Sequence, residues 1–241
     1  HFRDIKITMP DIYLKDMDMK IAVTSASGGL GSAIINQLLN LKLKNQIIGL
    51  ARTPEKTQNL GVEIRKGDYT DKEELEKSLQ GVDTVLLVSG MDAPEKRIEQ
   101  HRNVINAAKN AGAQKIVYTS IFGETGKTSF SPIIASNRQT EEDVKNCGLR
   151  WVIGRNGLYI EPDVEYIETY KKEGKIANCA GNGKCSYTTR NELGYAYSQM
   201  LLEDKHNGHI YTLAGEAISQ QELTDYINNT FGTSLVYESM S

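Results

Sequence analysis

The sequence predicts an α/β fold: a doubly wound parallel sheet covered by helices on both faces. From Lys20 onward, short runs of aliphatic and β-branched residues alternate with longer amphipathic segments. These runs are almost wholly apolar, which is typical of parallel strands that are buried on both faces. Strand–helix alternation of this kind implies right-handed crossovers between neighbouring strands. We therefore expect an open parallel sheet, with a small α/β lobe contributed by the carboxyl-terminal part.

The first part of the chain supplies the expected core, which we assign to residues 19–155. Its first helix places Leu30, Ile34 and Leu38 on one face, as packing against a sheet requires. The other helices are predicted near 71–79, 96–111 and 135–146. The strands are predicted at Ile21–Thr24, Gln46–Ala51, Glu63–Lys66, Thr84–Val88, Lys115–Thr119 and Arg150–Gly154.

The rest of the chain has a looser pattern. We expect residues 156–241 to form a substrate-side lobe that is interleaved with the core and lies over the edge where the strands end. Residues 1–18 mix charges with isolated apolar residues, and we treat them as an extension of uncertain origin. Within the lobe we predict a loop at Asn156–Pro162, helices near 163–173 and 190–203, a turn at Gly181–Gly183, and a strand–helix–strand stretch from His209 to Tyr237.

Composition and charge exclude several kinds of partner. The chain has 241 residues, of which 39% are hydrophobic and 24% charged, so it can bury a core. Its net charge of −3 comes from interspersed charges, so no nucleic-acid partner is expected. The apolar runs are too short to cross a bilayer and no export signal is visible, so we expect no membrane partner and a cytoplasmic location. Three cysteines without a close pair predict no metal site, and a homodimer is compatible with the sequence.

The sharpest local signal lies between the first strand and the first helix. Free amide groups at a helix amino terminus hold a diphosphate well, as in NAD(P)-binding Rossmann folds. Gly28 would let the backbone approach the phosphates, and Gly31 would let the helix pack closely. Ser25 stands where the usual spacing has glycine, so we expect either a strained turn or a reshaped loop. The predicted cofactor contacts of this segment are Thr24, Ser25, Ala26, Ser27, Gly28, Gly29 and Leu30.

Arg52 follows the second strand and favours NADP(H) over NAD(H). An NAD-preferring site usually has a carboxylate there for the ribose hydroxyl, whereas arginine suits the 2′-phosphate. The alternative is a solvated surface arginine. Further polar residues follow the third, fourth and fifth strands and are candidate cofactor contacts or simple turn formers: Asp68, Tyr69, Ser89, Gly90, Thr119 and Ser120.

Several stretches taken together resemble the NmrA-like atypical short-chain dehydrogenases/reductases, the group that includes quinone and triphenylmethane reductases. They are Ala22–Gly31, Gly67–Tyr69, Gln100–Lys109, Tyr118–Ser120, Arg155–Tyr159, Ala180–Lys184 and Thr189–Arg190. The resemblance implies cofactor contacts in the glycine loop, at Arg52 and Gly90, and at Asn156, Gly157, Leu158, Tyr159, Ile160, Glu161 and Thr188. It also implies a further carboxyl-terminal segment that this chain lacks, so we expect the substrate side to be incomplete.

The catalytic pair of ordinary short-chain dehydrogenases is missing. None of the twelve tyrosines is followed by lysine four residues later, which argues against alcohol chemistry through such a pair. Hydride transfer to a quinone tolerates the loss, because its phenolate-like product is far less basic than an alkoxide. Candidates for lining the substrate pocket are Asn137, Asn156 and Tyr159, although Asn137 could be an exposed helix residue and Tyr159 a core residue. We interpret His101 as a structural histidine.

Two functions follow from these features. The first is an NADPH-dependent reductase that transfers hydride to a quinone or a similar conjugated acceptor. The second is a nonenzymatic NADP(H)-binding redox sensor that acts through a protein partner, for which binding must differ between the two redox forms. A third outcome, loss of dinucleotide binding through Ser25, also stays open.

Overall fold

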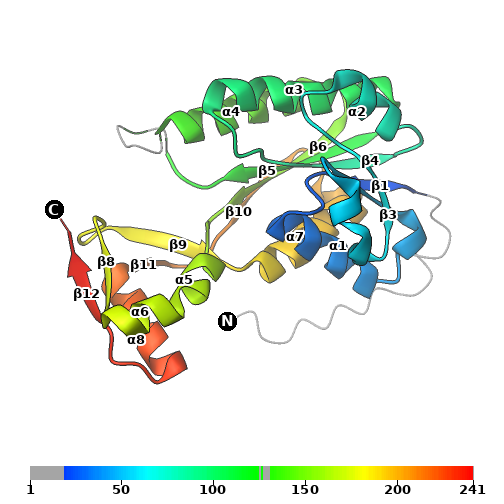
Figure 1. The fold of residues 1–241 in the computed structure, drawn as a ribbon. Coiled ribbons are helices and arrows are strands. Elements are labelled where there is room, and N and C mark those ends of the chain that lie inside the picture. The colour runs from blue at the N-terminus through cyan, green and yellow to red at the C-terminus, as the bar shows by residue number, and fades with distance from the viewer. Residues whose placement is uncertain (1–18, 125, 127–130, 241) are drawn as a thin grey trace.

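The computed structural model describes residues 19–124, 126 and 131–240, and it confirms the doubly wound fold (Figure 1). Within these residues a seven-stranded sheet has the order β10-β6-β5-β4-β1-β2-β3, with parallel pairing throughout. The order reverses beside β1, so the carboxyl ends of β1 and β4 flank the crevice where ligands bind in such sheets. The strands are β1 (Ile21–Val23), β2 (Ile47–Ala51), β3 (Glu63–Lys66), β4 (Thr84–Val88), β5 (Lys115–Ile121), β6 (Arg150–Asn156) and β10 (His209–Leu213).

Helices cover both faces of this sheet, as Figure 1 shows. One layer contains α2 (Lys72–Ser78), α3 (Pro94–Asn110) and α4 (Ser131–Lys145), and the other contains α1 (Gly29–Asn40) and α7 (Arg190–Leu202). Successive strand residues serve opposite cores: Leu87 packs in one hydrophobic cluster, and Leu86 in the other. Burial on both faces explains why the strands are apolar along their whole length.

A smaller lobe follows β6 and lies beside the end of the sheet where that strand finishes (Figure 1). It has a small core of its own, made by Ile176, Leu223, Ile227 and Leu235. Its strands pair in the orders β11-β9-β7 and β12-β8, and β10 returns to the main sheet. The elements of the lobe are β7 (Leu158–Tyr159), α5 (Glu161–Glu165), α6 (Ile167–Glu173), β8 (Lys175–Asn178), β9 (Lys184–Thr188), β11 (Ala217–Ser219), α8 (Gln220–Phe231) and β12 (Val236–Ser239).

The elements differ from the prediction in a few places. The strands β8, β9 and β11 were not expected, because each is short and mixes polar with apolar residues, and the short strand β7 lies within the segment expected as a loop. The helix expected over 163–173 is divided at Tyr166 into α5 and α6, and α4 begins at Ser131 rather than at residue 135. Short 3₁₀ turns occupy Lys44–Gln46, Pro54–Lys56, Gln58–Leu60 and Asp204–His206. The expected extension at 1–18 lies outside the described residues.

None of the helices in the described part of the chain combines the length and apolar character that a membrane crossing requires.

Candidate functional site

Helix α1 begins at the crevice without a side-chain cap. Its N-cap residue is Gly28, and its first turn contains no acidic residue. By contrast, α7 and α8 each begin with a complete capping box, formed by Thr189 with Glu192 and by Ser219 with Glu222. The first amide groups of a helix have no acceptor within the helix, and the helix dipole adds positive charge there. The uncapped end of α1 is therefore suited to binding an anion.

Gly28 and Gly31 lie close to the backbone of the turn before α1. A Cβ atom on Gly31 would lie 2.4 Å from the carbonyl oxygen of Ser25, and one on Gly28 would lie 3.2 Å from the same oxygen. That oxygen accepts a hydrogen bond from the Gly28 amide at 2.9 Å, which closes the turn. Ser27, Gly28 and Gly29 are exposed at the crevice. The backbone here is accordingly open to close approach by a ligand.

Ser25 adopts the conformation that glycine usually provides. Its φ of 50° lies in the left-handed region, which costs a residue with a Cβ about 1–2 kcal/mol. Of the two outcomes expected for this serine, the structure shows the strained turn rather than a reshaped loop.

The hydroxyl of Tyr69 supports this turn from below. It lies 2.5 Å from Thr24 Oγ1 and 3.1 Å from Ser25 Oγ, and it donates to the Val88 carbonyl at 2.8 Å. Thr24 Oγ1 in turn accepts the Val88 amide at 2.9 Å. Burial raises the pKa of Tyr69 to about 12, so its hydroxyl keeps its proton. The side chain therefore ties the loop to the end of β4, and its hydroxyl points beneath the loop rather than into the crevice.

Arg52 is exposed at the carboxyl end of β2, and among the described residues its guanidinium forms no ion pair. Asp68, at the end of β3, accepts hydrogen bonds from the Thr70 amide at 2.9 Å and from the Thr70 hydroxyl at 2.7 Å. These bonds lower the pKa of Asp68, and the positive charge of Arg52 lowers it further. Asp68 thus forms the local turn that the sequence analysis named as its alternative role, while Arg52 presents its charge to solvent.

The polar residues after β4 and β5 are placed differently from one another. Ser89 and Gly90 are half-buried at the crevice, where the Ser89 amide donates to Thr119 Oγ1 and the Gly90 amide to His101 Nε2. Thr119 and Ser120 are buried, and the Ser120 hydroxyl donates to Glu141 at 2.6 Å. The side chains of Thr119 and Ser120 therefore bond to the loop after β4 and to α4 and do not face open space.

His101 joins three elements in the interior. Its Nε2 accepts the Gly90 amide at 2.8 Å, and its Nδ1 lies 2.9 Å from Thr140 Oγ1. Burial lowers the pKa of His101 to about 3, with a smaller contribution from the charge of Arg97. A neutral imidazole that uses both nitrogens in this way holds α3, α4 and the loop after β4 together, as a structural histidine does.

The three candidate pocket residues are not equally accessible. Asn137 is only 2% exposed, and its Oδ1 accepts the Tyr118 hydroxyl at 2.7 Å, so the alternative of an exposed helix residue is wrong. Asn156 is 4% exposed and accepts the Tyr197 hydroxyl at 2.6 Å. Tyr159 is half-buried, with its hydroxyl 3.4 Å from Asn156 Nδ2. Only Tyr159 of the three retains substantial exposure.

The residues after β6 lead from the crevice into the lobe. Gly157 lies tightly against β9, since a Cβ there would come within 2.6 Å of the Ser186 carbonyl oxygen. Leu158 is exposed, and the Ile160 amide donates to the carbonyl of the buried Thr188 at 3.1 Å. Glu161 accepts the Arg190 amide through Oε1 at 2.6 Å. Its Oε2 is buried and finds no hydrogen-bond partner among the described residues.

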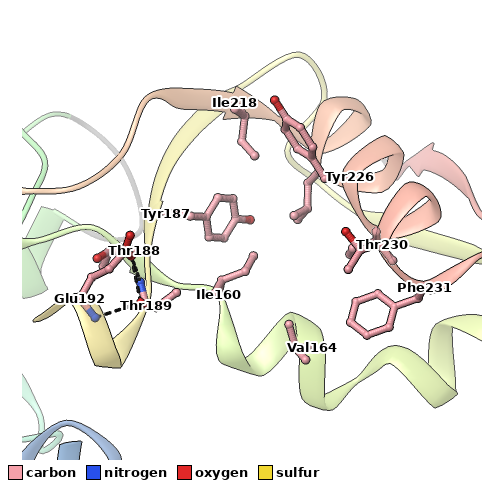
Figure 2. Close-up of a pocket in the computed structure, with 12 residues that line it drawn as sticks. Ile160, Val164, Tyr187, Thr188, Thr189, Glu192, Ile218, Tyr226, Thr230 and Phe231 are labelled. Atoms are coloured by element: carbon pink, nitrogen blue, oxygen red, sulfur yellow. Dashed lines mark hydrogen bonds between the residues drawn. The ribbon is translucent and has the colours of Figure 1, made fainter. Parts of the chain in front are cut away.

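An apolar groove of about 360 Å³ adjoins this segment (Figure 2). Ile160 and Thr188, two of the predicted cofactor contacts, lie at its edge, and the Tyr187 ring points between its walls. The sequence analysis missed the opposite wall, for which the amphipathic spacing of α8 was the available signal. That wall is formed by Ile218, Leu223, Tyr226, Ile227, Thr230 and Phe231.

Comparisons with known proteins were made for the whole chain. The family described as NAD(P)H-binding matches residues 25–180. Quinone oxidoreductase 2 of Escherichia coli is 34% identical over 92% of this chain and 78% of the relative. The NADP(H) complex of Citrobacter sp. triphenylmethane reductase is 33% identical, with a TM-score of 0.86 over 92% of this chain and 80% of that one. The NADPH complex of the Escherichia coli quinone oxidoreductase is 33% identical, with a TM-score of 0.83 over 92% and 78%.

Proposed function

The chain belongs to the NAD(P)H-binding family and is an oxidoreductase related to quinone oxidoreductase 2, and on this basis we propose that it transfers hydride from NADPH to a quinone or a similar conjugated acceptor. The observation that carries the proposal is the uncapped amino terminus of α1 at the crevice between β1 and β4. That position is where a parallel sheet of this kind binds a dinucleotide.

The residues fit NADPH in two places. The first-turn amides of α1, with exposed Gly28 and Gly29, suit the diphosphate because they offer donors without side chains in the way. Arg52 suits the ribose 2′-phosphate, since its charge is exposed and among the described residues no carboxylate is ion-paired with it. The relatives solved with NADP(H) support the preference for the phosphorylated cofactor.

The protonation states at the site favour an acceptor whose reduced form can be protonated by water. Bound NADPH would supply the hydride. Burial raises the pKa values of Tyr118 and Tyr197, and it raises that of Tyr69 to about 12, so these phenols stay protonated and do not act as bases near neutral pH. A quinone takes up a hydride to give a phenolate-like oxygen, which water can protonate. The chain then has chiefly to align the two reactants.

The groove of Figure 2 is suited to such an acceptor. Its walls are mainly apolar, which favours a planar conjugated ring, and the Tyr187 ring offers a surface for stacking. It starts at Ile160 and Thr188, beside the predicted cofactor segment. We place the acceptor at this end of the groove.

A steady-state assay tests the proposal. The purified protein should oxidise NADPH in the presence of 1,4-benzoquinone at a rate proportional to protein concentration. Dinucleotide binding without oxidation above the buffer rate would contradict the enzymatic function and leave the redox-sensor interpretation. A protein that binds neither NADPH nor NADH would contradict the proposal as a whole.

A further inference from the structure

Arg190, the first residue of α7, lies directly against the phosphate loop. A Cβ atom on Gly29 would be 2.9 Å from Arg190 Nε and 3.0 Å from Cζ, so the guanidinium lies beside the first residue of α1. The side chain is 28% exposed, so it is not sealed off from solvent. Its sequence position, after Thr189 at the start of a helix, did not indicate a role for this arginine.

The packing of α1 against α7 explains this position. Gly194 permits the close approach, because a Cβ there would lie 3.0 Å from the Ala33 carbonyl oxygen. Arg190 is one helical turn before Gly194, and Gly29 is one turn before Ala33. The two helices therefore begin side by side. This backbone packing places the backbone of Arg190 near the amino end of α1.

The surroundings of Arg190 orient it but do not neutralise it. Its guanidinium lies 5.6 Å from the centre of the Tyr159 ring, which is a cation–π contact. Its ion pair with Glu165 is long, at 3.6 Å, and that carboxylate is mostly exposed, so the pair contributes little. The cation thus sits beside the positive end of the α1 dipole, while the nearby Glu161 carboxylate bonds to the backbone amide of Arg190.

We propose that Arg190 binds the diphosphate of the dinucleotide from the lobe side, opposite the amides of α1. This inference rests on the proposed function, which places the diphosphate at the start of α1. A guanidinium offers five N–H donors in a planar fork and forms strong, charge-assisted bonds with phosphate oxygens. Arg190 and Arg52 then recognise different parts of the ligand. Arg52 contacts a phosphate that only NADP(H) has, whereas Arg190 contacts one that NADP(H) and NAD(H) share.

Because Arg52 and Arg190 would contact different phosphates, ligands that lack one of these phosphates distinguish their roles. Calorimetric titrations of wild type, Arg190→Ala and Arg190→Lys would use NADPH, NADH and adenosine 2′-phosphate, which lacks the diphosphate. Arg190→Ala should weaken NADPH and NADH by the same factor, about 10- to 100-fold, and change adenosine 2′-phosphate by less than about twofold. Arg190→Lys, which keeps the charge but not the fork, should fall between wild type and the alanine variant.

A matched arginine serves as the control. Arg150 is also ion-paired, with Asp204 at 2.9 Å, but it lies at the amino-terminal end of β6, away from the crevice at the carboxyl ends of the strands. Arg150→Ala should bind all three ligands as wild type does. A purely structural role for Arg190, through Tyr159 and Glu165, would lower the thermal midpoint and weaken all three ligands together.

Three results would overturn the inference. The first is an alanine variant that binds NADPH within twofold of wild type, and the second is one that binds it more tightly, since the arginine would then obstruct the site. The third is an equal loss for adenosine 2′-phosphate. Wild-type protein that binds no dinucleotide would instead contradict the proposed function, which separates the two failures.

Discussion

Replacing Tyr69 with phenylalanine removes one buried hydroxyl from beneath the phosphate loop and leaves the ring in place. The hydroxyl contacts Thr24 and Ser25 on the loop and donates to the Val88 carbonyl at the end of β4. Because Ser25 holds a left-handed conformation, the loop depends on such contacts to keep its shape. The substitution should therefore affect both stability and cofactor binding.

The size of the effect follows from the number of groups left without a partner. A neutral buried hydrogen bond contributes about 1 kcal/mol net, and an unsatisfied buried partner costs about 1–3 kcal/mol. The Val88 carbonyl loses a donor, and the Thr24 and Ser25 hydroxyls lose a shared acceptor. Ser25 is half-buried, so water can replace part of its loss. We expect Tyr69→Phe to lower the free energy of unfolding by about 2–3 kcal/mol and to weaken NADPH binding.

Urea denaturation and NADPH titration measure the two effects. Tyr211→Phe is the control. Tyr211 is half-buried on β10, and its hydroxyl is bonded to His206 Nδ1 at 2.9 Å rather than to the loop. It should cost under about 1 kcal/mol and leave NADPH affinity unchanged. A Tyr69→Phe variant with a free energy of unfolding within about 0.5 kcal/mol of wild type and an unchanged NADPH affinity would contradict this prediction.

Three more predictions address the site and its surroundings. Arg52→Ala should weaken NADPH by about 1–3 kcal/mol and NADH hardly at all, and equal weakening of both in calorimetry would refute its role. Gly31→Ala should destabilise the protein by about 1–3 kcal/mol, because its Cβ would meet the Ser25 oxygen at 2.4 Å, while Gly28→Ala, at 3.2 Å, should cost less; the reverse order in denaturation would contradict the geometry. His101 stays neutral in the folded protein down to about pH 3, whereas the unfolded chain binds a proton there below about pH 6.5. The unfolded state holds the extra proton between these values, so stability should fall on acidification by up to about 1.4 kcal/mol per pH unit from this group, and His101→Gln should flatten that slope.

The core of the fold was predictable because its signals are local. Strands such as β4 are buried on both faces and show an unbroken apolar run, and α1 shows its sheet-facing stripe. The lobe was less predictable, because β8 pairs with β12 about 60 residues away in sequence, and neither strand is apolar enough to stand out. The division of the chain into a core and a substrate-side lobe stays a prediction.

The candidate site was likewise predictable only where its signals are local in the sequence. The glycine loop and Arg52 were predicted from their spacing after strands, and a strained turn at Ser25 was one of the two outcomes expected from its departure from glycine. The support by Tyr69 and the position of Arg190 were not found. Both depend on long-range packing, of the segment after β3 against the loop and of α7 against α1, for which Gly194 was an ambiguous sign. Sequence patterns locate the backbone of such a site, whereas the side chains that complete it come from elements distant in the chain.

The central claim is that the start of α1 holds a dinucleotide diphosphate and that Arg52 selects the 2′-phosphorylated form. Parallel calorimetric titrations of the wild-type protein with NADPH and NADH test this claim most directly. We predict saturable one-to-one binding of both, with NADPH the tighter ligand. Failure of NADPH to bind would contradict the claim, and tighter binding of NADH would contradict the assignment of Arg52.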